Sequence, residues 1–305
     1  MLDRQLVEQV AGALATDEGL VEKDWHVVRA LAVIAAVDHG DAVPAFSGGT
    51  SLSKGWGLIK RFSEDIDFKV TMPVAASRSR ASRERRTYRQ RILDALTASR
   101  FTPAGAPLVG DESRFFSIDL IYPSVFAVGP GLRPHIRVEM SFHAPVLPPI
   151  ARPLQSLIAM ARHQLPEVPA FPCIDPVETA ADKLSALAWR VLRRQRGGVG
   201  DDTTLIRHLH DLAALASTVM AAPAFTTLVL QVVAADAGRG GDATASSTPA
   251  LLFAGMIERL RSDRLWAAEY DDFVRQVSFA RPDERIGFAQ ALAAVVALVA
   301  RLGAA

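Results

Sequence analysis

The stretch "FSGGTSLSKGWGLIKRFSEDIDFKV", residues 46–70, contains the features that decide the fold. Two glycines follow a short apolar run and precede hydroxyl residues, which is typical of a strand that turns tightly into a helix. Asp65 and Asp67 then alternate with Ile66 and Phe68, so a strand here buries one face and presents both carboxylates on the other. The stretch therefore predicts strand, glycine turn, helix and a second strand with two acids on one face.

The flanking sequence predicts an α+β core followed by a helical region. Residues 2–37 have helical periodicity, and four short β-like runs follow: "VPAFSG", "DIDFKV", "FFSIDLIY" and "HIRVEMSF". After the proline cluster "APVLPPIARP" the pattern is almost wholly helical, apart from a glycine-rich segment at 236–249 that we expect to be a mobile surface loop. We expect one domain at residues 1–150 and a helical domain at 151–305.

Composition narrows the class of protein. The chain has 305 residues and a formal net charge of +1, so nucleic-acid binding would depend on local clusters. The single cysteine, Cys173, excludes an internal disulfide and favours a reducing compartment, by default the cytoplasm. The N-terminus carries acids where a signal peptide is positive and apolar. The apolar tract Ile286–Leu302, interrupted by Gln290 and Arg301, is shorter than the roughly 20 residues of a bilayer span; we expect a buried terminal helix and no membrane partner.

The two acids predict a metal site. Their mutual repulsion favours a hard cation between them, and Mg²⁺ is the usual cation when phosphates are the substrate. A third ligand is expected from a neighbouring strand, either Glu139 of "HIRVEMSF" or Asp119 of "FSIDLIY". The alternatives are a solvated strand edge for the acid pair and a cross-strand ion pair of Asp119 with Arg137.

The glycine turn predicts a seat for phosphate. Backbone N–H groups at such a turn bind anions, and nearby hydroxyl groups and a lysine add donors and charge. The predicted contacts are Gly48, Gly49, Thr50, Ser51 and Lys54. Because this seat and the metal carboxylates are chemically complementary, together they indicate nucleotide chemistry.

Two basic clusters predict contact with an RNA backbone, although a charge run is more often a solvated helix face. The first is "SRSRASRERRTYRQR", in which Tyr88 would offer an aromatic surface, and the second is "WRVLRRQRGG". The residues predicted to bind RNA are Arg78, Arg80, Arg83, Arg86, Arg89, Arg190 and Arg194.

The opening stretch resembles the signature of the AbiEii/AbiGii nucleotidyltransferase toxins, the MenT-type toxins of type IV toxin–antitoxin systems. Further matching pieces follow the same order, and the resemblance covers roughly residues 20 to 215: "VEKDW", "IRVEMS", "DPVETAADKLSALAWR" and "RHLHDL". Gly49 and Asp65 stand farther apart than in many nucleotidyltransferases. The resemblance implies a nucleotidyltransferase-like mixed β-sheet with flanking helices, joined to a helical C-terminal domain that completes the active site and the acceptor cleft.

The resemblance also implies individual roles. Asp65 and Asp67 would hold Mg²⁺, residues 48–51 would contact the triphosphate, Lys183 would neutralise it, and Asp211 would complete the active site. From the residue pattern alone, Lys183 suits a solvated basic face and Asp211 suits an exposed helical ion pair with Arg207. The "EKDW" segment is interpreted as structural.

The implied activity is transfer of a nucleotide from an NTP to the 3′ end of tRNA, which blocks translation. Two Mg²⁺ ions are expected, with Mn²⁺ as a possible substitute. A cognate antitoxin from a neighbouring gene is implied as partner, with no direct contact required. The alternatives are a nucleotidyltransferase that modifies a small molecule or a protein, and a catalytically silent binding module. The sequence leaves open which NTP is used and which tRNAs are targeted.

Overall fold

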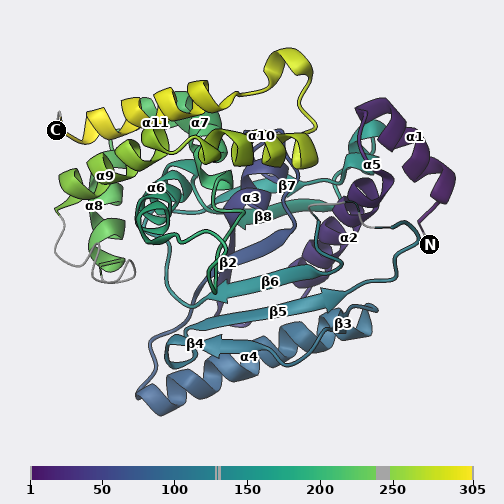
Figure 1. Cartoon of the computed structure of the whole chain (residues 1–305). Coiled ribbons are helices and arrows are strands. Elements are labelled where there is room, and N and C mark those ends of the chain that lie inside the picture. The colour runs from purple at the N-terminus through teal and green to yellow at the C-terminus, as the bar shows by residue number, and fades with distance from the viewer. Residues whose placement is uncertain (1, 128, 130–131, 238–247, 304–305) are drawn as a thin grey trace. The chain divides into compact units, whose positions relative to one another are not determined.

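The computed structural model describes residues 2–127, 129, 132–237 and 248–303 (Figure 1). The chain divides into two compact units, residues 1–175 and residues 176–305, each of which is described by itself. The boundary predicted near residue 150 is therefore too early. Strands β7 (Ile150–Leu154) and β8 (Val168–Cys173) belong to the sheet of the first unit. The sequence "VPAFPC" of β8 carries two prolines, which argue against a strand and hid it from the pattern analysis.

The first unit is a mixed sheet with flanking helices. Its α-helices are α1 (Arg4–Leu14), α2 (Glu18–Ala35), α3 (Gly48–Lys54), α4 (Arg78–Ala98) and α5 (Leu157–Ala161), and a short 3-10 helix is η1 (Asp111–Ser113). Besides β7 and β8, its strands are β1 (Val43–Ser47), β2 (Asp65–Thr71), β3 (Thr102–Pro103), β4 (Leu108–Gly110), β5 (Phe115–Ile121) and β6 (Ile136–Ser141).

In the described part of the chain the sheet has eight strands in the order β3-β5-β6-β2-β1-β8-β7, with β4 paired to β5. Strand β2 is antiparallel to β1 and parallel to β6, and β6 is antiparallel to β5. Strand β1 is parallel to β8, with Phe46 opposite Cys173. The predicted mixed sheet is confirmed.

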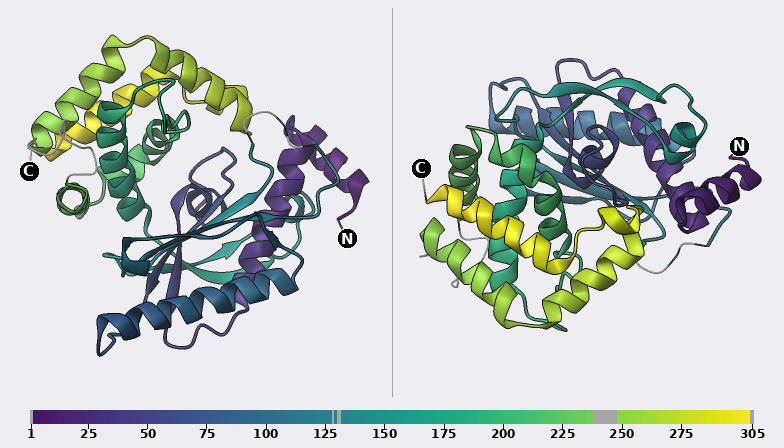
Figure 2. Two further views of the ribbon diagram at one scale, coloured as in Figure 1. Left: turned by 60° about the horizontal axis from the view of Figure 1, so that its bottom comes forward. Right: turned by 90° about the horizontal axis from the view of Figure 1, so that it is seen from above.

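Alternation in the central strands separates an apolar face from a polar face. Ile66, Phe68 and Val70 of β2 are buried in one core with Leu31 of α2 and Ile92 of α4. Helices α2 and α4 therefore cover the apolar face. In the left view of Figure 2, α4 lies below the sheet and α3 lies above it. The polar face carries Asp65 and Asp67.

The second unit is helical, as predicted. Its α-helices are α6 (Pro176–Arg193), α7 (Arg207–Met220), α8 (Phe225–Ala235), α9 (Pro249–Ser262), α10 (Leu265–Val277) and α11 (Phe288–Leu302), and a 3-10 helix is η3 (Pro282–Glu284). Large apolar side chains such as Phe253, Trp266 and Tyr270 fill its core. Of the glycine-rich segment predicted to be a mobile loop, residues 238–247 lie outside the described residues.

The expectation of a buried terminal helix is only partly right. Helix α11 buries Ala291, Val295 and Leu298. However, only 17% of the apolar stretch within Pro282–Leu302 is buried, and among the described residues this is the one stretch long and apolar enough to cross a membrane by length and composition. Core helices of water-soluble proteins meet the same criterion, so composition alone assigns no membrane to this helix.

Candidate active site

The glycine turn lies directly against one of the two acids. Strand β1 ends at Ser47 and helix α3 begins at Gly48, whose φ of +75° is in the left-handed region. A Cβ atom at Gly48 would lie 1.9 Å from Asp67 Oδ2, far inside van der Waals contact. Glycine is therefore needed for its backbone conformation and for the close approach of the carboxylate.

The residues that follow the turn point into the protein. A Cβ atom at Gly49 would lie 2.8 Å from Arg61 Nη2 and 2.9 Å from Ser63 Oγ, so this glycine is also closely packed. Thr50 and Ser51 are buried, and the Thr50 hydroxyl donates to the backbone carbonyl of Asp65. Triphosphate contact by residues 48–51 stays a prediction, and the structure gives the Thr50 hydroxyl an internal acceptor.

Lys54, also predicted to bind the nucleotide, closes α3 against α2. Its ammonium forms an ion pair with Asp24, and both side chains are buried. Asp24 Oδ2 also accepts a hydrogen bond of 2.7 Å from the backbone N–H of Leu157. The structure thus assigns Lys54 a contact that anchors the end of α3, and its contact with the triphosphate stays a prediction.

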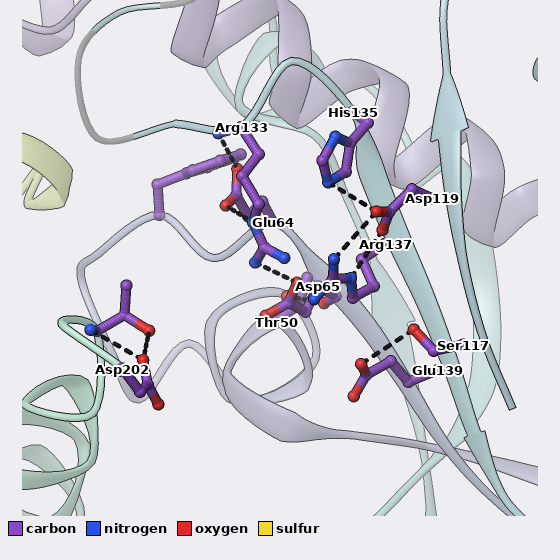
Figure 3. Close-up of polar contacts among 12 residues, drawn as sticks. Thr50, Glu64, Asp65, Ser117, Asp119, Arg133, His135, Arg137, Glu139 and Asp202 are labelled. Carbon is purple, nitrogen blue, oxygen red and sulfur yellow. Dashed lines mark hydrogen bonds and ion pairs between the residues drawn. The ribbon is translucent and has the colours of Figure 1, made fainter. Parts of the chain in front are cut away.

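The acid pair shares its face of the sheet with Glu139. Parallel pairing of β2 and β6 places Asp65 opposite Arg137 and Asp67 opposite Glu139. Ser117 of β5 donates to Glu139 Oε1 at 3.2 Å (Figure 3). Three carboxylates therefore lie on one polar face, two of them directly opposite each other.

Asp119, the other candidate third ligand, has a different partner. Arg137 donates to it from Nε at 2.7 Å and from Nη2 at 3.0 Å, and these bonds lower the pKa of the Asp119 carboxyl. Figure 3 shows this pair beside His135. The cross-strand ion pair considered as the alternative is therefore present. The geometry favours Glu139 over Asp119 as the partner of the acid pair.

The donor chemistry of this face fits a hard divalent cation. Asp65, Asp67 and Glu139 offer only oxygen ligands, which Mg²⁺ and Mn²⁺ prefer. Within residues 2–127, 129, 132–237 and 248–303, no group of three or more His, Cys, Asp or Glu side chains stands close enough to hold a metal ion. Instead, Asp65 Oδ1 accepts a hydrogen bond of 2.6 Å from Arg133.

A charged network that no sequence motif indicated surrounds Asp65. Arg133 Nε donates to Glu64 Oε1 at 2.6 Å, and Lys23 pairs with the same carboxylate. Lys23 is fully buried at 0% exposure, and burial lowers its pKa. Burial opposes the charge of Arg133, yet Asp65 and Glu64 together raise its pKa. The network joins α2, the residue before β2 and the segment before β6.

The "EKDW" segment of α2 is the sequence signal that could have revealed this network. Glu22 accepts hydrogen bonds from the backbone N–H groups of Val125 and Phe126, at 2.8 and 3.0 Å. Lys23 and Asp24 bind Glu64 and Lys54. Three successive charged residues with at most 1% exposure are rare in a helix, because burying charge is costly unless it is paired.

The first arginine cluster lies on the other side of the sheet. It forms the N-terminal half of α4, whose buried residues Tyr88 and Ile92 pack in the core of the apolar face. Two predictions are therefore corrected. Tyr88 is buried because it fills the core, and Arg89 is buried with its guanidinium over the Phe116 ring at 5.5 Å. The remaining predicted RNA contacts of this helix are exposed: Arg78, Arg80, Arg83 and Arg86.

The second unit brings together the two residues implied for catalysis. Lys183 Nζ of α6 lies 2.8 Å from Asp211 Oδ2 of α7, with side-chain exposures of 8% and 0%. The solvated interpretation of both residues is wrong. Beside the pair, burial and the charge of Lys183 lower the pKa of His208 well below its ordinary value. A buried ion pair adds little to stability, because the desolvation of both charges offsets their attraction.

The second arginine cluster is engaged within the same unit. Arg194 is buried, donates to Asp201 at 2.7 Å and to Glu269 at 2.6 Å, and stacks on Trp266. Its predicted RNA contact is therefore not supported, because both carboxylates already hold its guanidinium. Arg190 pairs with Asp202 at 2.9 Å, and its side chain keeps 33% exposure. Both arginines line a cavity of about 450 Å³.

Comparison with known proteins identifies the family. The sequence profile described as "Nucleotidyl transferase AbiEii toxin, Type IV TA system" matches residues 29–295. Among solved structures, the chain is similar to MenT4, nucleotidyltransferase toxin Rv2826c from Mycobacterium tuberculosis H37Rv, at a TM-score of 0.54 and 21% identity over 99% of each chain. The comparison with curated protein sequences finds no match. The chain belongs to the AbiEii nucleotidyltransferase toxin family of type IV toxin–antitoxin systems.

Proposed function

We propose that this toxin transfers a nucleotide from an NTP to the 3′ end of tRNA and so blocks translation. The observation that carries the proposal is the Asp67 carboxylate seated on Gly48, which joins the glycine turn and the acid pair into one site. Family membership supports nucleotidyl transfer, and a hydroxyl at an RNA end is a suitable nucleophile.

In the proposed reaction, the acceptor hydroxyl oxygen bonds to the α-phosphorus of the NTP. The bond from that phosphorus to the bridging oxygen of the β-phosphate breaks, pyrophosphate leaves, and the hydroxyl proton passes to solvent. Asp65 and Asp67, with Glu139 beside Asp67, would hold two Mg²⁺ ions or Mn²⁺ in their place. Bound there, the metal would lower the pKa of the hydroxyl and neutralise pyrophosphate.

Lys183 and Asp211 would act on the triphosphate from the helical unit. An ammonium held by a buried carboxylate has a fixed position, so it loses little free energy to reorganisation when charge develops on the leaving group. The proximity of Lys183 and Asp211 within one unit supports a shared role.

The proposed RNA contacts of the first unit lie on α4. The exposed arginines Arg78, Arg80, Arg83 and Arg86 lie on α4, which covers the face of the sheet opposite the acids. They would therefore contact the body of a tRNA and not its reacting end. The same observation favours the second candidate, a nucleotidyltransferase whose acceptor is a small molecule or a protein, because such an acceptor does not need α4.

The proposed setting is the cytoplasm, where NTPs and tRNA are present. A cognate antitoxin encoded nearby would counteract the toxin, and the proposal requires no direct contact between them. The single buried thiol, Cys173, is compatible with a reducing compartment.

The test is incubation of the protein with each α-³²P-labelled NTP in turn, first with total tRNA and then with a tRNA-free cell extract. Label at the 3′ end of tRNA supports the proposal. Label found only in protein or small molecules would show that the acceptor is not tRNA, while nucleotidyl transfer would remain the reaction. Absence of pyrophosphate release with every NTP and acceptor would contradict catalysis. Asp67→Asn is the control, because it removes a charge from the site at constant side-chain size.

A further inference from the structure

Arg133 contacts Asp65, a predicted metal ligand of the acid pair, directly. Its Nη2 donates to Asp65 Oδ1 at 2.6 Å, and its Nε donates to Glu64 Oε1 at 2.6 Å (Figure 3). The planar guanidinium thus spans two neighbouring carboxylates with separate nitrogen atoms, a geometry that a lysine ammonium cannot reproduce.

The position of Arg133 is itself fixed at several points. Its backbone N–H donates to Glu64 Oε2 at 3.1 Å, and Lys23 donates to both Glu64 and the backbone carbonyl of Arg133. The Lys23 side chain is fully buried and the Glu64 side chain is 14% exposed, so water competes little for these hydrogen bonds. Lys23 and Arg133 carry two positive charges, and Glu64 and Asp65 carry two negative charges. This pairing offsets the free-energy cost of burying the charges.

The contacts with Lys23 and Glu64 are sufficient to fix the backbone at residue 133. The additional bond from Arg133 to Asp65 is not needed for that purpose. Arg137 provides the comparison, because it lies directly opposite Asp65 in the β2–β6 register. Its guanidinium binds Asp119 through both Nε and Nη2. The two guanidinium groups therefore bind different carboxylates: Arg137 binds Asp119 and Arg133 binds Asp65.

We infer that Arg133 is a positioning residue that holds Asp65 through Oδ1 and serves as its counter-charge until a divalent cation binds. The inference rests on the proposed function of Asp65 as a metal ligand. In the metal-free protein the guanidinium offsets the repulsion between Asp65 and Asp67. The same positive charge opposes entry of a free divalent cation, so orientation of the carboxylate is gained at the expense of cation affinity.

Arg133→Gln should change cation affinity and kcat in opposite directions. Arg133→Gln removes the opposing charge, so affinity for free Mn²⁺ should rise by about tenfold. The same variant loses the fixed orientation of Asp65, so kcat at saturating cation should fall by about tenfold while the KM for NTP stays nearly constant. A merely structural role predicts weaker cation binding and lower kcat together.

The experiment measures Mn²⁺ binding without nucleotide, by electron paramagnetic resonance of free Mn²⁺. It compares the parent with Arg133→Gln, Arg133→Lys, Arg137→Gln and Asp65→Asn. Arg133→Lys should bind Mn²⁺ like the parent, because it keeps the charge, and should have low kcat, because it cannot span both carboxylates. Arg137→Gln should change affinity much less than Arg133→Gln.

Unchanged or weaker binding by Arg133→Gln, with binding lost in Asp65→Asn, would overturn the inference and leave the proposed function intact. Parent-like binding by Asp65→Asn would refute the metal assignment, and the inference would fall with it. If Arg133→Gln does not fold, a measurement on the parent protein still tests the inference. In an arginine Nε–H spectrum, assigned with Arg133→Lys, Mg²⁺ addition should shift the Arg133 signal, and an unmoved signal would also overturn the inference.

Discussion

The two faces of the central sheet carry charge in different ways. On the polar face, Asp65, Asp67 and Glu139 are placed individually by strand alternation and by the β2–β6 register. On the other face, the arginines of α4 occur as a run on a helix that covers an apolar core. Alternation in a strand assigns each side chain to a face. A charge run on a helix leaves open which side of the sheet the helix covers.

The largest expected effect concerns the acids of the polar face. Asp65→Asn or Asp67→Asn should lower the rate of nucleotide transfer on the order of a thousandfold, because each removes charge from the proposed metal site. Asp119→Asn removes the same charge from β5, where Arg137 is its partner, and should cost less than about tenfold. Transfer rates under single-turnover conditions check this. Equal losses of transfer rate in all three variants would contradict the view that Asp65 and Asp67 hold the metal and Asp119 does not.

The next effect concerns the glycine turn. Gly48→Ala forces a Cβ against Asp67 Oδ2 and should slow transfer by about a hundredfold by displacing that carboxylate. Gly57 is a matched control, because its φ of +63° is also left-handed and a Cβ there meets no atom within 4 Å. Gly57→Ala should show only the backbone cost, as a lower melting temperature. Similar transfer rates in both variants would show that crowding at Asp67 has no catalytic consequence.

A smaller effect comes from the apolar face, where burial lowers the pKa of His26 in α2 to about 4. His26 of the unfolded chain becomes protonated below about pH 6.5, whereas His26 of the folded chain becomes protonated only near pH 4. The contribution of neutral His26 to the free energy of unfolding is therefore fully present above about pH 6.5 and decreases as the pH falls. His26 should account for roughly 2 kcal/mol of lost stability between pH 7.5 and pH 5.

Urea unfolding at several pH values measures this loss. His26→Gln should flatten the dependence on pH, and His163→Gln, at an exposed position, should leave it unchanged. The same pH dependence in parent and His26→Gln would remove His26 as its source.

The smallest effect concerns α4. Arg83→Gln with Arg86→Gln should weaken tRNA binding by about tenfold and flatten its salt dependence by up to about 2 units of logarithmic slope, if both contact phosphate. Arg89→Gln is the matched control on the same helix, because Arg89 is buried over Phe116 and should not alter the slope. Filter binding at several salt concentrations provides the data. An unchanged slope in the double variant would favour an acceptor other than RNA.

Local pattern was sufficient to predict β2 and its two faces, the glycine turn and the helical second unit. Each depends on residues close in sequence, such as the alternation of Asp65 and Ile66. Strand β8 was missed because its two prolines are atypical of a strand, and its pairing with β1 and β7 involves residues distant in sequence. The domain boundary was misplaced for the same reason.

The site was predictable in its residue types and not in its contacts. Lys54 and Arg194 have sequence contexts typical of phosphate binding, yet each meets a carboxylate distant in sequence, Asp24 and Glu269 respectively. Arg133 has no motif around it, and only the three-dimensional structure brings it to Asp65. Pairing of buried charges is decided by tertiary packing, so sequence pattern can propose candidates but cannot assign partners.

The position of β1 between β2 and β8 has a consequence for biosynthesis. The backbone N–H of Ile174 donates to the Phe46 carbonyl at 2.8 Å, so β1 acquires one of its neighbours only after the ribosome has synthesised the chain through residue 174. Until then a nascent chain presents an unpaired strand edge beside the glycine turn, and such edges promote aggregation. A fragment ending at residue 150 would keep that edge permanently, whereas one ending at 175 would include the strand that covers it.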